Sequence, residues 1–356
     1  VDLKEREEFT FSPVNFGVVL HAVIREVCDE IKKNGESYYL ISEEKRREMV
    51  KRSVAAITDI YQNSILKDSS RNSFMIKRME DLADRTVWAM GEQLKCGDFV
   101  PFVFEHKFNM EVGDGDRKQL MSGTIDRVDI CENGTDVYVR IIDYKTGKKD
   151  FNIVKTYYGI DIQLMVYMEA AMKLVAKMRP GKNVIPAGVF YYNISDPIVS
   201  ATTESAEEIE DKIKGELRLK GMVNSDKDIA EKMDNTEGTS LNIPVSRKAD
   251  GGFDSRRSKV MNTEQFNMLG RFVDVRAVDT ADRIAGGDIR RSPYKDGQFS
   301  SCDRCPYGAV CGFSVDLPGC NYRKLKKFDD EVLWNNIKEG VDENGKKMDT
   351  GAEECD

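Results

Sequence analysis

An Asn-Gly step between two runs of alternating apolar and polar residues constrains the fold of this chain more than any other feature. The step is Asn133-Gly134. The runs on either side of it are residues 120–130 and 136–145. Asn-Gly is the strongest short-range signal for a two-residue hairpin turn. We therefore predict an antiparallel β-ribbon in which Asp126 lies opposite Ile141.

Alternation along the two strands gives this ribbon one face that is apolar near the turn and charged at its open end. Its uncharged positions are Thr124, Val128, Ile130, Val137, Val139 and Ile141. Asp126, Asp143 and Lys145 gather at the open end of the same face. The opposite face is largely polar and holds Arg127, Asp129, Tyr138, Arg140 and Tyr144. A slip of one residue would exchange the two faces, so the pattern fixes which face is buried.

Two carboxylates on a buried face are expensive unless a cation compensates them. A solvated ion pair would explain Asp143 and Lys145 alone, but it leaves Asp126 on the apolar face unexplained. Mg²⁺ prefers carboxylate oxygens, backbone carbonyls and water, and such an ion can polarise a phosphoryl oxygen and acidify a bound water. Lys145 could orient that water or neutralise phosphate charge. The pattern therefore favours metal-dependent hydrolysis of phosphodiesters.

The remaining periodicity predicts an α/β fold, with a central mixed sheet that has the hairpin in its middle and helices on both sides. Helices are expected at residues 15–35, within 43–97, at 159–178 and at 263–287. Two further strands are expected at residues 99–112 and 185–194. Residues 202–256 are polar and interrupted by glycines, so we expect a peripheral insertion there.

Charge and hydropathy limit the classes of protein that remain. The chain has a formal net charge of -8, from 54 basic and 62 acidic side chains. This argues against a broad electrostatic grip on nucleic acid but leaves room for a local basic channel or a partner that supplies one. No run of about 18 apolar residues and no signal peptide is present, so we expect a cytoplasmic protein. The first residue is not Met, which suggests a fragment of a longer chain.

Three segments resemble the RecB-like branch of the PD-(D/E)XK nucleases: GTIDRVDI, IIDYKTG and GIDIQLMVY. The resemblance implies a restriction-endonuclease-like core in which Asp126 is the first catalytic acid. Asp143 and Lys145 match the D-x-K motif and would also be catalytic. Gln163 and Tyr167 match Q-x-x-x-Y, which lies on one helix face and would position the DNA strand.

The same branch has a histidine in a G-x-x-x-H pattern on an N-terminal helix, and FGVVLHAV supplies it here. The metal ligands that the resemblance implies are His21, Asp126, Asp143 and the backbone carbonyl of Tyr144. The implied ion is Mg²⁺ or Mn²⁺. Glu105, in FVFEHKF, resembles the acid on the strand before the hairpin and is expected to support the site.

Cys302, Cys305 and Cys311 form a C-x2-C-x5-C cluster, and thiolates so close can share a metal or an iron–sulfur cluster. The triplet resembles that of AddB-type nucleases and of CRISPR-adaptation exonucleases. In those families it joins a cysteine N-terminal to the nuclease core to bind a [4Fe-4S] cluster. This chain starts at Val1, after the expected position of that cysteine, so we expect an incomplete or absent cluster and a loose C-terminal segment. Cys320 could substitute for the fourth ligand or complete a zinc site.

The resemblance implies two parts, a nuclease domain at 1–300 and a cysteine-bearing segment at 301–356. The function implied is that of a divalent-metal-dependent DNA exonuclease module of an AddAB-type helicase–nuclease that repairs double-strand breaks. Its partners would be single-stranded DNA ends and an AddA-type helicase subunit. Two alternatives remain open. One is a catalytically silent module that binds DNA ends or a partner, and the other is a free-standing exonuclease of the CRISPR-adaptation type.

Overall fold

The computed structural model describes residues 13–60, 70–112, 118–200 and 205–342. The chain forms two compact units, each built from three stretches. The first unit comprises Val1–Phe108, Gly123–Phe151 and Tyr167–Thr263. The second comprises Asn109–Ser122, Asn152–Val166 and Glu264–Asp356. This division differs from the boundary expected near residue 300, because the long helix that begins at Thr263 groups with the C-terminal residues.

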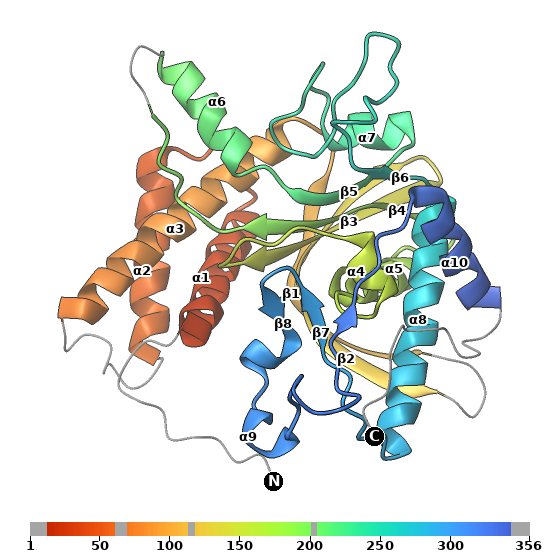
Figure 1. Cartoon of the computed structure of the whole chain (residues 1–356). Coiled ribbons are helices and arrows are strands. Elements are labelled where there is room, and N and C mark those ends of the chain that lie inside the picture. The colour runs from red at the N-terminus through yellow and green to blue at the C-terminus, as the bar shows by residue number, and fades with distance from the viewer. Residues whose placement is uncertain (1–12, 61–69, 113–117, 201–204, 343–356) are drawn as a thin grey trace. The chain divides into compact units, whose positions relative to one another are not determined.

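A six-stranded mixed sheet has the order β1-β2-β3-β4-β5-β6 (Figure 1). The strands are β1 Val100–Val112, β2 Gln119–Asn133, β3 Asp136–Lys145, β4 Asn183–Asn193, β5 Lys220–Asn224 and β6 Val260–Met261. Strands β2 and β3 are antiparallel, β3 and β4 parallel, β4 and β5 antiparallel, and β5 and β6 parallel. The predicted α/β fold with a central mixed sheet is confirmed.

The register of the β2–β3 hairpin differs from the prediction by two residues. Val128, and not Asp126, pairs with Ile141. The last pair before the turn is Asn133 with Asp136, so Asn133 belongs to the strand. The glycine that follows it has φ +60° and begins the turn. The prediction was wrong because it placed the turn one residue too early.

This shift keeps every side chain on its predicted face, because a shift of two residues preserves the alternation. It changes which residues lie opposite Asp126 and Asp143 on the neighbouring strand. The paired ladder ends at Arg127 and Ile142, so Asp126 and Asp143 are the next residues on their two strands. The observed register therefore brings these acids closer together than the predicted one.

Three helices pack on one face of the sheet. They are α1 Pro13–Lys33, α2 Glu43–Ile60 and α3 Ser70–Lys95, which contact one another (Figure 1). Their apolar residues form one buried cluster with alternate strand residues, namely Cys131, Tyr138, Ile142, Tyr144, Phe190 and Tyr192. The strand residues that point the other way are also buried, among them Val128, Ile130, Val139, Ile141, Val189 and Tyr191. The hairpin is therefore buried on both faces, as in the centre of an α/β sheet.

The segment 202–256 is less peripheral than the sequence suggested. It contains α6 Ala206–Glu216, β5 and α7 Lys227–Met233. Strand β5 pairs with β4, and Val223 and Ile229 belong to the main apolar cluster. A Cβ at Gly221 would lie 1.9 Å from the carbonyl oxygen of Val189. That glycine, which made the segment look irregular, is required where the two strands approach.

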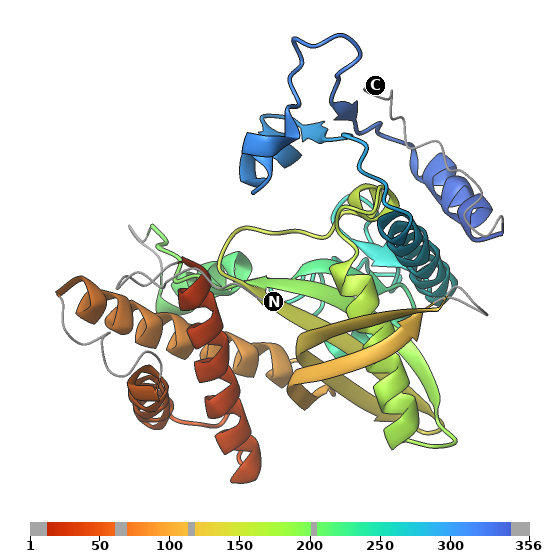
Figure 2. The ribbon, with the colours of Figure 1, turned by 90° about the horizontal axis from the view of Figure 1, so that it is seen from below.

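The second unit contains two longer helices, α8 Thr263–Ala285 and α10 Asp330–Asp342, and a short α4 Ile153–Tyr157. A three-stranded sheet has the order β8-β7-β9, from Phe299–Ser300, Tyr294–Asp296 and Arg323–Lys324. The part from β7 to α10 is blue in Figure 2. Helix α5, Gln163–Met178, has residues in both units. Across the described part of the chain, no helix has the length and apolar character needed to span a membrane.

Candidate active site

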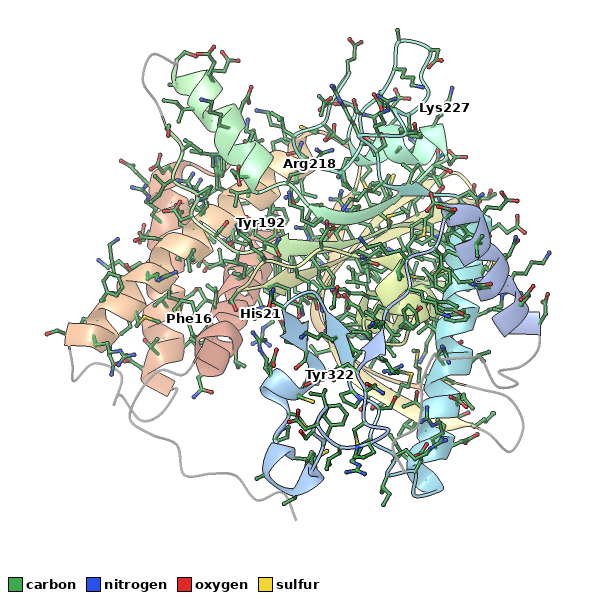
Figure 3. The ribbon with its side chains drawn as sticks, viewed as in Figure 1. Phe16, His21, Tyr192, Arg218, Lys227 and Tyr322 are labelled. Carbon is green, nitrogen blue, oxygen red and sulfur yellow. The ribbon has the colours of Figure 1, made fainter. Side chains whose placement is uncertain are left out.

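Three side chains from three elements of the first unit converge beside the open end of the hairpin. His21 lies on α1 on the side that faces the sheet (Figure 3). Its Nδ1 is 3.4 Å from Oε1 of Glu105 on β1 and 3.5 Å from Oδ1 of Asp126 on β2. One ligand atom from each residue lies within 4.8 Å of the others. Among the residues that the structure describes, no other group of three such side chains meets this condition.

Glu105 has an unusual backbone. Its φ is +47°, and it is the one non-glycine residue in the described ranges with a positive φ. This left-handed conformation costs about 1–2 kcal/mol for an L-residue and persists where the surrounding structure imposes it. Glu105 was expected only to support the site, but the structure places its carboxylate in the group with His21.

Asp126 uses its two carboxylate oxygens differently. Oδ2 accepts a hydrogen bond of 2.7 Å from the backbone N–H of Tyr144, and Oδ1 faces His21. The Tyr144 ring also meets the His21 ring edge-on, with centroids 5.8 Å apart. Tyr144 therefore holds two members of the group in place. The use of its carbonyl as a metal ligand stays a prediction.

Asp143 and Lys145 form an ion pair beside this group. The Asp143 side chain is 2% exposed and that of Lys145 is 27% exposed, so the acid is enclosed while the ammonium group reaches solvent. The structure brings the predicted acid and lysine together. Asp143 is absent from the compact group of three, because its carboxylate turns to Lys145 and Glu105 occupies the third position.

The pKa values of His21 and Asp143 are both raised at this site. Burial alone would lower the pKa of His21. Hydrogen bonds to Asp126 and Glu105 and the charges of those acids outweigh burial and raise it to about 10. Burial, followed by the charge of Asp126, raises the pKa of Asp143 to about 6 despite Lys145. Both shifts have the sign expected for a site that attracts a cation.

The donor set fits a divalent ion. Six ligands around Mg²⁺ lie about 2.1 Å from it, so opposite ligand atoms are about 4.2 Å apart. The ligand atoms of the three residues lie within 4.8 Å of one another, so only a small approach of the side chains would bring them to such distances. Carboxylate oxygens suit Mg²⁺ and Mn²⁺, and the imidazole of His21 adds a nitrogen donor. His21, Glu105 and Asp126 can therefore hold such an ion, with Asp143 next to them.

The opposite face of the hairpin carries a charged cluster where the sequence predicted only a polar face. Arg127 donates from Nε and Nη2 to the two carboxylate oxygens of Asp129, both at 2.7 Å. Arg140 Nε donates to Asp129 Oδ2 at 2.9 Å. All three side chains are at most 1% exposed. Burial acts to raise the pKa of Asp129, but the two guanidinium groups lower it. The signal that could have revealed this cluster is that Arg127 and Asp129 are two residues apart on one strand, with Arg140 on the same face of the next strand.

Gln163 and Tyr167 keep their predicted spacing on α5. Gln163 is the first residue of the helix, and Tyr167 follows one turn later. The Tyr167 ring meets Phe108 edge-on at 5.8 Å. A Cβ at Gly123 would lie 2.9 Å from the Phe108 ring, so this glycine permits the aromatic contact. The DNA-positioning role of the two α5 residues stays a prediction.

The cysteine triplet lies in the second unit. Cys302 is in the 3-10 helix Ser301–Arg304, Cys311 ends α9 Gly308–Cys311, and Cys305 between them is exposed. All three are free thiols, as an iron–sulfur ligand set requires. Cys320 is buried and disulfide-bonded, so it is not free to complete the set.

A mixed sheet whose hairpin supplies two acids and a lysine, next to a histidine and a further acid, has the donor groups that a metal-dependent hydrolase needs. The model of the PD-(D/E)XK nuclease superfamily matches residues 1–312, and the chain belongs to this family.

Proteins named as one subunit of an ATP-dependent helicase/deoxyribonuclease are similar to this chain along nearly its whole length. One from Thermoanaerobacter sp. (strain X514) is 33% identical in an alignment of 357 positions that covers 97% of this chain and 31% of the relative. One from Caldanaerobacter subterraneus subsp. tengcongensis is 34% identical in an alignment of 364 positions that covers 99% of this chain and 31% of the relative. One from Clostridium acetobutylicum is 33% identical, over 97% of this chain and 30% of the relative. The chain therefore spans about a third of the length of these relatives.

Proposed function

We propose that this chain is a deoxyribonuclease module that hydrolyses phosphodiester bonds with the help of a divalent cation. The observation that carries the proposal is the cluster of His21, Glu105 and Asp126 beside the Asp143–Lys145 pair. The raised pKa values of His21 and Asp143 support it: the Asp126 and Glu105 carboxylates raise that of His21, and burial followed by the charge of Asp126 raises that of Asp143.

The roles follow from position. His21, Glu105 and Asp126 would hold Mg²⁺ or Mn²⁺ together with Asp143 and the Tyr144 carbonyl. When bound, such an ion polarises a phosphoryl oxygen and lowers the pKa of water. Lys145, partly exposed beside the cluster, donates hydrogen bonds to the attacking water or to the phosphate. The hydrogen bond from Tyr144 fixes the carboxylate plane of Asp126.

The biological setting follows from the relatives, whose name couples a deoxyribonuclease to an ATP-dependent helicase. We place this chain as the nuclease part of such an assembly, acting on single-stranded DNA ends during the repair of double-strand breaks. A helicase subunit of the AddA type is the expected partner. The chain's net charge of -8 is consistent with a partner that supplies part of the grip on DNA.

The three free thiols, Cys302, Cys305 and Cys311, are proposed as three ligands of a [4Fe-4S] cluster. Their C-x2-C-x5-C spacing in the sequence and their free state support this role. Visible absorbance and iron analysis of protein purified without oxygen, compared with a Cys305→Ser variant, would test it. Equal iron content in the two proteins would contradict it.

The alternatives receive less support. A catalytically silent module has no need for the complete set His21, Asp126, Asp143 and Lys145, which the structure brings into one region. A free-standing exonuclease is not favoured by relatives about three times as long as this chain.

Cleavage of end-labelled single-stranded DNA with Mg²⁺ or Mn²⁺ tests the proposed activity. We expect Asp143→Ala and Lys145→Ala each to lower the single-turnover rate by about 10²–10⁴-fold. The exposed Lys77–Asp81 ion pair on α3 offers a matched control, and Lys77→Ala and Asp81→Ala should leave the rate unchanged. Cleavage by Asp143→Ala or Lys145→Ala at the wild-type rate would refute the assignment.

A further inference from the structure

We propose that Lys149 binds a backbone phosphate of the DNA strand, next to the phosphate that is cut. This role rests on the proposed function, since it assigns a substrate contact to the same site. The lysine lies in the loop that follows β3, four residues after Lys145. Strand β4 places this loop against the catalytic pair.

A buried tyrosine on β4 links the two lysines. Tyr191 pairs with Asp143 in the parallel β3–β4 register, so the two side chains lie on one face of the sheet. Lys145 Nζ lies 5.6 Å from the centroid of the Tyr191 ring, and Lys149 Nζ lies 4.9 Å from the same centroid. Lys149 therefore brings a second ammonium group to the face that carries Asp143 and Lys145.

The backbone around Lys149 is fixed by β4. Its N–H donates to Oδ1 of Asn193 at 2.9 Å, and Nδ2 of Asn193 donates back to the Lys149 carbonyl at 3.0 Å. The N–H of Ile194 donates to the Lys145 carbonyl at 2.8 Å. A site whose backbone is already ordered loses less conformational entropy when it binds a ligand.

Asp150, the nearest acid along the chain, forms an ion pair with Lys259. Each phosphate of a DNA strand carries one negative charge, so two ammonium groups that lie against the same ring can each contact one of two neighbouring phosphates. Lysine acts on phosphate as a point charge and tolerates the varied geometry of a single strand. The net charge of the chain is -8, so the chain as a whole does not attract DNA. The two lysines provide a local attraction for its phosphates.

Binding of fluorescein-labelled single-stranded DNA tests the proposal, with Ca²⁺ replacing Mg²⁺ and the DNA checked for integrity on a gel. We expect Lys149→Gln to weaken binding about 5–10-fold at 0.1 M salt. The slope of log K against log salt should become shallower by about 0.7, as for one lost phosphate contact on a single strand. With Mg²⁺, KM should rise by the same factor while kcat changes less than about twofold. Mn²⁺ affinity measured by calorimetry should stay unchanged.

Lys148→Gln is the matched control, because it removes the same charge from the exposed neighbouring residue. We expect it to change binding by less than about twofold. Equal effects of Lys148→Gln and Lys149→Gln would overturn the proposal, since they would report general electrostatics only. If Lys149→Gln binds DNA as tightly as the wild type does and the protein still cuts DNA, the role of Lys149 is overturned. The proposed nuclease function would then be unaffected. A wild-type protein that neither cuts nor binds DNA would refute the proposed function itself.

Discussion

The two faces of the β2–β3 hairpin carry acids in opposite electrostatic settings. On one face Asp129 is fully buried between Arg127 and Arg140, and its carboxylate accepts three hydrogen bonds from them. On the other face Asp126 and Asp143 lie in a cluster with one lysine, one histidine and a further acid. The pKa of Asp129 is lowered and that of Asp143 is raised. A buried acid with its own cations contributes to the structure, whereas a cluster with surplus acids is prepared for an external cation.

This contrast predicts that the two kinds of acid respond oppositely to removal. Losing the acid of the paired cluster should destabilise the fold. Losing one from the other cluster should spare or stabilise the metal-free fold and abolish activity.

Asp129→Ala should destabilise the fold by about 3–5 kcal/mol, because it leaves two guanidinium groups buried without a counter-charge. Urea unfolding followed by circular dichroism measures the change. Asp81→Ala, which breaks an exposed ion pair on α3, is the control and should cost less than about 0.5 kcal/mol. Equal effects at the two positions would show that the buried cluster does not support the fold.

Asp126→Asn should lower the cleavage rate by about 10²–10³-fold and abolish the strongest Mn²⁺ binding seen by calorimetry. The amide oxygen can still accept the hydrogen bond from Tyr144, so only the charge is lost. In EDTA the variant should unfold at a urea concentration close to that of the wild type, because it loses both the repulsion with Asp143 and the attraction to protonated His21. Retention of tight Mn²⁺ binding by this variant would contradict the metal site.

The pH dependence of the free energy of unfolding, measured in EDTA, should also differ between Asp143 on one face and Asp129 on the other. The folded pKa of Asp143, about 6, lies above its unfolded value of about 3.9. Its stabilising contribution is therefore fully present below about pH 3.9 and is lost as the pH rises through about 6. Asp143→Asn should remove this part of the slope between about pH 4.5 and 7. Asp129 has the opposite sign, since its folded pKa is lowered and its contribution is lost only as the pH falls through that lowered value. If the free energies of unfolding of the wild type and of Asp143→Asn change with pH in the same way across this range, the pKa of Asp143 is not raised.

Glu105→Gly should give the smallest change. Glycine adopts positive φ without strain, so the variant should gain up to about 1 kcal/mol of stability in EDTA. The same variant should bind Mn²⁺ about tenfold more weakly, which corresponds to about 1.4 kcal/mol. Glu105→Gln, which keeps the backbone strain, should weaken Mn²⁺ binding without the gain in stability. Unchanged Mn²⁺ affinity in both variants would remove Glu105 from the ligand set.

The hairpin, its faces and the pairing of Asp143 with Lys145 could be predicted, because alternation and the Asn-Gly turn are local properties of the sequence. The register could not, since the turn could begin at Asn133 or at the following glycine. Glu105 was underrated because a positive φ inside a strand leaves no mark on the pattern of residues. The buried Arg127–Asp129–Arg140 cluster was taken as a polar face because composition does not distinguish charges that meet solvent from charges that meet each other. Strand β5 was missed because Gly221, which a close strand contact requires, resembles a loop residue.

The central claim is that a divalent cation binds where α1, β1 and β2 meet. Anomalous diffraction from crystals grown with Mn²⁺ tests it most directly. We predict a peak within bonding distance of His21, Glu105 and Asp126, and its loss in crystals of Asp126→Asn. A peak only at another position, or no peak at this position in crystals of active enzyme, would contradict the claim.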